Sequence, residues 1–89
     1  MIERNLVLTN KLGLHARAAA KLVQLAETYS SEIKIRKDNV EANGKSILSV
    51  LLLAAPMGTE LTFIATGQDE TAALDAIANL IERRFEEDE

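Results

Sequence analysis

The chain has 89 residues, 47% of them hydrophobic, which predicts one small domain spanning residues 1–89. It contains no cysteine and a single histidine, so the composition excludes a disulfide framework and argues against a zinc site within one chain. The net charge of −4, with one tyrosine and two phenylalanines, argues against nucleic-acid binding, which needs a basic surface and stacking aromatic residues.

The sequence also argues against export and membrane insertion. Charged and polar residues occupy positions 1–10, where a signal peptide would need an apolar segment. The longest apolar run, residues 47–55, is broken by Ser49 and is too short to span a bilayer. We therefore expect a cytoplasmic protein, and no residue pattern indicates a cofactor.

A strand over residues 2–9 and a helix over residues 16–28 are the first two predicted elements. The loop Asn10–Leu14 between them contains Gly13, a residue type common in turns. The apolar residues of the helix recur with the period of a core-facing stripe: Ala19, Leu22, Val23, Leu25 and Ala26. The opposite face carries Arg17, Ala20, Lys21 and Gln24. This face is either ordinary solvated surface or a docking surface for an acidic partner.

The sole histidine, His15, lies where the loop turns into this helix. The N–H groups of a first helical turn lack intrahelical partners, and the helix dipole makes this end positive, so it attracts anions. Histidine is an unusual N-cap, which leaves these donors free, and Arg17 adds a planar cation suited to phosphate oxygens. A neutral imidazole here is a candidate phosphoryl acceptor. The alternative is a surface histidine without a chemical role.

The run GLHAR, residues 13–17, followed by small residues, resembles the active-site loop of the HPr family. These proteins are the histidine-containing phosphocarriers of the phosphoenolpyruvate-dependent phosphotransferase system. The resemblance implies that His15 accepts a phosphoryl group on Nδ1 from phosphorylated enzyme I and passes it to a histidine of an enzyme IIA protein. It also implies that Arg17 and the backbone N–H groups of Ala16 and Arg17 stabilise the group. HPr proteins usually have proline where this chain has Ala18.

A strand over residues 32–37, a turn at residues 38–39 and a strand over residues 40–42 form a predicted hairpin. The second helix opens at Ser46, a good N-cap residue. The GKSI context of Ser46 resembles the regulatory site that HPr kinase/phosphorylase modifies in many bacteria. Ser46 is therefore either a plain cap or a modification site, where a phosphate would repel an acidic partner.

The second helix, predicted over residues 47–55, is apolar on almost every side and ends at Pro56 and Gly58. A two-layer domain buries one stripe of such a helix, so the remainder forms an exposed patch typical of an interface. A deeper core and self-association are the alternatives. In HPr this helix docks onto enzyme I and the sugar-specific acceptors. The predicted docking residues are Ala20, Lys21, Gln24, Ile47, Leu48 and Leu51.

A strand over residues 60–67 and a helix that Asp69 or a neighbour caps complete the predicted elements, and the last four residues are expected to be frayed. The helix has an apolar face of Ala73, Ile77, Leu80 and Ile81. The order βαββαβα predicts an α+β domain with one face of an antiparallel sheet covered by three helices. The HPr resemblance adds an open-faced two-layer sandwich with strand order 1-4-2-3.

Two alternatives to a phosphocarrier of sugar transport stay open. Within the family, the acidic C-terminus and the NKLG run are compatible with a nitrogen-branch regulatory phosphocarrier. From another class, a non-catalytic anion-binding or protein-interaction domain would use His15 and Arg17 to hold a fixed anion. RNA binding is a weaker third hypothesis. We expect a monomeric carrier protein, rather than an enzyme, with enzyme I and enzyme IIA proteins as partners.

Overall fold

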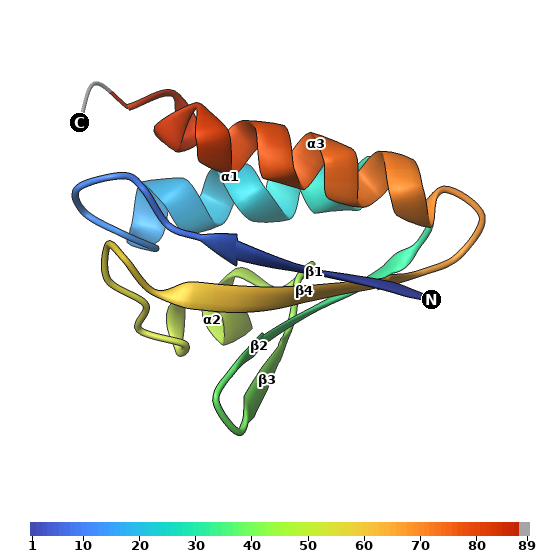
Figure 1. Cartoon of the computed structure of the whole chain (residues 1–89), viewed down its shortest axis with the longest axis horizontal. Coiled ribbons are helices and arrows are strands. Elements are labelled where there is room, and N and C mark those ends of the chain that lie inside the picture. Colours follow the sequence, from blue (N-terminus) through green and yellow to red (C-terminus); the bar gives the residue numbers. More distant parts are fainter. Residues whose placement is uncertain (88–89) are drawn as a thin grey trace.

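The structure, a computed structural model, describes residues 1–87. Its strands and helices follow the predicted order (Figure 1): β1 Ile2–Val7, α1 Ala16–Glu27, β2 Glu32–Lys37, β3 Val40–Asn43, α2 Ile47–Leu51, β4 Glu60–Thr66 and α3 Glu70–Glu82. A 3-10 turn, η1 Arg84–Glu86, follows α3. The four strands form an antiparallel sheet in the order β1-β4-β2-β3, which confirms the predicted α+β fold and its strand order. No helix within residues 1–87 is long and apolar enough to cross a membrane.

The sheet has one covered face and one open face. Helices α1 and α3 lie side by side over the covered face (Figure 1). Helix α2 packs against α1 and β3. Phe63, in the middle of β4, pairs with Arg4 of β1 and with Ile35 of β2. On the open face the strands present polar side chains, and the Thr62 hydroxyl donates to Asn5 Oδ1 at 2.8 Å. The alternation of apolar and polar residues therefore sets which face the helices cover.

The predicted apolar faces of both long helices are in the core. Fully or almost fully buried residues of these faces are Ala19, Leu22, Val23, Ala26, Ala73, Ile77, Leu80 and Ile81. The largest buried side chains are Phe63 at the sheet centre and Phe85 just after α3. Removal of these apolar surfaces from water is the main force that fixes α1, and with it His15, on the sheet.

The predicted second helix is too long. It ends at Leu51 rather than residue 55, because Ala54 has a positive φ of 50°, which no α-helix can accommodate. The carbonyls of this segment are held by other elements. Lys37 Nζ donates to the Leu53 carbonyl at 3.0 Å, and the Leu14 N–H donates to the Ala55 carbonyl at 2.8 Å. The β1 strand also ends earlier than predicted, at Val7.

Asp69 was expected to cap α3, but its side chain makes no capping hydrogen bond. Its carboxylate instead accepts from the Ser30 N–H at 2.8 Å, from the Ser31 N–H at 2.9 Å and from the Ser31 hydroxyl. The hydrogen bond from the Ser31 hydroxyl and that from the Ser30 N–H lower the pKa of Asp69 to about 2. Asp69 therefore joins the loop after α1 to the loop before α3.

This contact predicts an acid-dependent loss of stability. The folded pKa of about 2 lies below the unfolded value of about 4, so the contribution of Asp69 is complete above pH ~4 and disappears as the pH falls towards ~2. In urea unfolding, the wild-type chain should lose stability through this window more steeply than Asp69→Asn. Parallel pH profiles for the two proteins would contradict the assignment.

Candidate functional site

The loop between β1 and α1 is fixed by contacts on both sides. Asn10 is fully buried, and its Nδ2 donates to the Gly13 carbonyl at 2.7 Å. Gly13 has a φ of +64°, and a Cβ there would lie 2.4 Å from the Ala55 carbonyl oxygen. Only glycine combines this backbone conformation with so close an approach. The loop therefore presents His15 in one defined place.

His15 is the N-cap of α1, at the position that the sequence predicted. Its backbone is extended, with φ −81° and ψ 179°, and its carbonyl accepts from the Ala19 N–H at 2.8 Å. Its side chain makes no capping hydrogen bond. The N–H groups of Ala16 and Arg17, at the positive end of the helix, therefore have no intrahelical acceptor.

An open hollow of about 720 Å³ lies beside His15. It is lined by Lys11, Leu12, His15, Ala16 and Arg17 and, from the C-terminal segment, by Glu86 and Glu87. Arg17 is exposed and makes no hydrogen bond or ion pair with any residue in the range 1–87. No group of three or more His, Cys, Asp or Glu residues in this range is arranged to hold a metal ion. The hollow thus brings together an imidazole, a helix start and a guanidinium, groups that suit a phosphoryl anion, and two carboxylates at its C-terminal side, which repel one.

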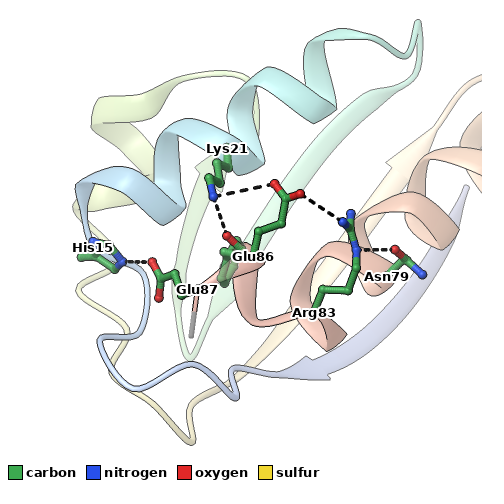
Figure 2. A network of polar contacts seen from close by, with 7 residues as sticks. His15, Lys21, Asn79, Arg83, Glu86 and Glu87 are labelled. Carbon is green, nitrogen blue, oxygen red and sulfur yellow. Dashed lines mark hydrogen bonds and ion pairs between the residues drawn. The ribbon is translucent and has the colours of Figure 1, made fainter. Parts of the chain in front are cut away.

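The C-terminal segment reaches this site, which the sequence did not predict. The carboxylate of Glu87 accepts a hydrogen bond from Nε2 of His15 (Figure 2), and Asn10 Nδ2 donates to its other oxygen at 3.0 Å. Burial raises the pKa of Glu87, but the hydrogen bonds from Asn10 and His15 and the nearby Lys21 charge outweigh it and lower this pKa below its usual value. Of the four residues expected to be frayed, Glu86 and Glu87 are placed against the domain, and residues 88–89 lie outside the described range.

A turn after α3 carries Glu87 to the site. Arg84, Phe85 and Glu86 all have left-handed φ values, of 55°, 55° and 63°. This conformation costs ~1–2 kcal/mol per residue. Burial of the Phe85 ring, worth ~1.5–3 kcal/mol, offsets part of that cost. Lys21 Nζ donates a hydrogen bond to the Phe85 carbonyl at 2.7 Å, and the same nitrogen lies 3.7 Å from Glu86 Oε1 (Figure 2).

The predicted docking residues differ in their surroundings. Lys21, expected on a free surface, is half-buried and its amine binds the turn after α3. Gln24 is exposed and Ala20 is half-buried. On α2, Ile47 and Leu48 are 43% and 66% exposed, as an interface would require, whereas Leu51 packs against the core. Leu52, which follows α2, is 72% exposed, and we call Ile47, Leu48 and Leu52 the α2 patch.

Ser46 is the N-cap of α2, as predicted. Its Oγ accepts from the Ser49 N–H at 3.4 Å, a long hydrogen bond. The capping role alone explains a serine at this position. Modification of Ser46 by a kinase stays a prediction.

The comparisons with known proteins identify the family. A family model described as "PTS HPr component phosphorylation site" matches residues 2–83. The chain belongs to the PTS HPr family. The phosphocarrier protein HPr of Xylella fastidiosa (strain 9a5c) is 48% identical over 88 residues, with 99% of each chain covered. The phosphocarrier protein NPr of Shewanella violacea is 45% identical over 86 residues, covering 97% of this chain and 94% of NPr. A crystal structure of HPr from Thermoanaerobacter tengcongensis, 42% identical, matches with a TM-score of 0.96 and full coverage of both chains.

Family membership confirms the resemblance that GLHAR indicated, and it places the chain among carrier proteins rather than catalytic enzymes. HPr and NPr relatives both match over nearly their whole length, so similarity favours neither branch. The expected monomer finds no support. A second HPr structure from Thermoanaerobacter tengcongensis, with a TM-score of 0.79, is of a dimer, and the related Crh of Bacillus subtilis forms a swapped dimer.

Two residues of the site were missed in the sequence. Asn10 had a weak signal, because asparagine side chains commonly bond to backbone groups a few residues along a turn. Glu87 had no signal in the sequence, because an acidic run at a chain end is typical of solvated surface. Its contact with His15 joins positions 72 residues apart.

Proposed function

We propose that this member of the HPr family is a cytoplasmic phosphocarrier that accepts a phosphoryl group on Nδ1 of His15 from phosphorylated enzyme I. It then passes the group to a histidine of an enzyme IIA protein. One observation carries the proposal. His15 is the N-cap residue of α1, its side chain makes no capping hydrogen bond, and it lies beside an open hollow that Arg17 also lines. The ring is 28% exposed, which leaves it accessible to two partners in turn.

The chemistry needs a nucleophile and stabilisation of negative charge. The Nδ1 lone pair forms the bond to phosphorus while the bond from phosphorus to the donor breaks, and its electron pair stays with the donor. The equatorial oxygens carry the charge of the transferring group. The guanidinium of Arg17 and the N–H groups of Ala16 and Arg17 supply donors that are in place before the group arrives. These groups of the chain supply the nucleophile and the hydrogen-bond donors that the transfer needs.

Partner docking is assigned to the α2 patch together with the exposed part of α1. Ile47, Leu48 and Leu52 form an apolar surface on and next to α2, which packs against α1. Gln24 adds a polar exposed position on α1. An apolar centre with a polar rim is the usual anatomy of a transient interface.

A nitrogen-branch role is the second candidate, because NPr of Shewanella violacea, at 45% identity, matches the chain nearly as well as its HPr relatives do. In that case the partners are the nitrogen-branch enzyme I and IIA proteins. The physical step at His15 is the same, so only the partner surfaces can distinguish the two branches.

A reconstituted relay tests the proposal. The chain is incubated with labelled phosphoenolpyruvate and enzyme I, separated, and then mixed with an enzyme IIA protein, with sugar-branch and nitrogen-branch pairs run in parallel. We expect label first on this chain and then on the IIA protein, and the faster pair identifies the branch. If both enzymes I label their own carriers but neither labels this chain, the fixed-anion binding domain replaces the phosphocarrier.

A further inference from the structure

We infer that Glu87 is a positioning residue for phosphoryl transfer at His15. Its carboxylate holds the imidazole with the proton on Nε2, which leaves the lone pair of Nδ1 as the acceptor. The inference rests on the proposed function and adds to it a residue from the far end of the chain. Figure 2 shows the contact, with Glu87 on the segment that follows η1 and His15 at the start of α1.

The identity of the contacting atoms decides the tautomer. A carboxylate that has lost its proton can only accept hydrogen bonds, so Nε2 of His15 must be the donor. A neutral imidazole has one N–H group. When Nε2 carries that hydrogen, Nδ1 has a free lone pair, and among residues 1–87 no hydrogen bond to Nδ1 is present. The lowered pKa of Glu87 supports an ionised carboxylate at neutral pH.

Glu87 is itself held in place, as a positioning residue must be. Its side chain is 12% exposed, and Asn10 Nδ2 donates to the carboxylate oxygen that His15 does not use, at 3.0 Å. Phe85, two residues earlier, is fully buried, and Lys21 binds its carbonyl. The three left-handed residues before Glu87 redirect the chain from α3 towards the site. A backbone strained in this way persists only where the surrounding contacts determine it.

The pairing also acts during the transfer itself. When Nδ1 bonds to phosphorus and the donor keeps its electron pair, the ring becomes positively charged while Nε2 keeps its hydrogen. The Glu87 carboxylate then faces a cation rather than a neutral donor, and the hydrogen bond strengthens. When the group leaves for the next acceptor, the electron pair of the N–P bond returns to Nδ1 and the ring is again neutral. Glu87 keeps its charge throughout and exchanges no proton.

Nitrogen NMR of the His15 ring tests the tautomer without any phosphate. At alkaline pH, once the ring resonances no longer change with pH, the wild-type chain should show a protonated Nε2 and an unprotonated Nδ1. In Glu87→Ala both resonances should shift towards the averaged values of free imidazole. In Glu87→Gln the amide oxygen still accepts, so the wild-type pattern should be kept. Glu86→Ala is the matched control, because Glu86 contacts Lys21 and Arg83 rather than the ring. Ring resonances unchanged in Glu87→Ala would overturn the inference.

The rate of phosphoryl transfer from enzyme I supplies the second measurement. Loss of one charge-assisted hydrogen bond should lower kcat for Glu87→Ala about tenfold, with KM for the chain nearly unchanged, because docking residues are untouched. Glu87→Gln should recover part of the rate, since it keeps the tautomer but not the charge. Unchanged kcat in Glu87→Ala would also overturn the inference. A wild-type chain that takes no phosphoryl group refutes the proposed function instead, and the NMR result still decides the tautomer.

Discussion

A His15→Ala variant is expected to accept no phosphoryl group from enzyme I while it keeps the fold. His15 holds the only imidazole in the chain, and its Nδ1 is the nucleophile of the proposed transfer. The loss of stability should be about 1 kcal/mol or less, because the ring makes no capping bond and its pair with Glu87 is partly exposed.

Label that is transferred from phosphoenolpyruvate and stays with the protein on a gel measures phosphoryl acceptance. Urea unfolding measures the free energy of unfolding. A folded His15→Ala chain that is labelled as fast as wild type would place the acceptor elsewhere. A variant that fails to fold would show that the residue has a structural role that the contacts of its side chain do not indicate.

A Gly13→Ala variant should be much less stable than the wild-type chain. The added Cβ would lie 2.4 Å from the Ala55 carbonyl oxygen and 2.7 Å from Pro56 Cα, so backbone must move. Left-handed strain and a forced overlap together cost about 2–5 kcal/mol. That is a large share of the ~5–15 kcal/mol that stabilises a typical domain. Because the same loop positions His15, phosphoryl transfer should slow as well.

Gly58→Ala is the matched control for this prediction. Gly58 also has a positive φ, of +90°, but a Cβ there would meet no atom within 4 Å. Its substitution should therefore cost only the backbone strain, about 1–2 kcal/mol. Denaturant midpoints of the two variants give the comparison. Equal losses would mean that the loop can move away from Ala55, and that contact with this residue does not fix the position of His15.

The parts of the structure that depend on local pattern were predictable. The apolar period of residues 19–26 identified α1, and the unusual histidine at its start identified the candidate site. Alternating residues in the strands identified the covered face. These features arise from side chains a few positions apart, so the sequence displays them directly.

The contacts that were missed join distant residues. The sequence predicted that Asp69 caps α3, which it directly precedes. Asp69 instead binds Ser30 and Ser31, which lie 39 and 38 positions away in the sequence. Glu87 binds His15 and Asn10, and Lys21 binds the turn that carries it. Left-handed φ values at three consecutive non-glycine residues leave no mark in the sequence. The packing of Phe85 in the finished core and the hydrogen bond from Lys21 offset part of the strain in that turn.

Phosphoryl uptake by the wild-type chain is tested most directly by intact-mass spectrometry after incubation with phosphoenolpyruvate and enzyme I. We expect the gain of one phosphoryl group, which mild acid removes, as a phosphorus–nitrogen bond requires. No change in mass, with sugar-branch and nitrogen-branch enzymes I that each phosphorylate their own carriers, would contradict the phosphocarrier function. A group that survives acid would contradict histidine as the acceptor.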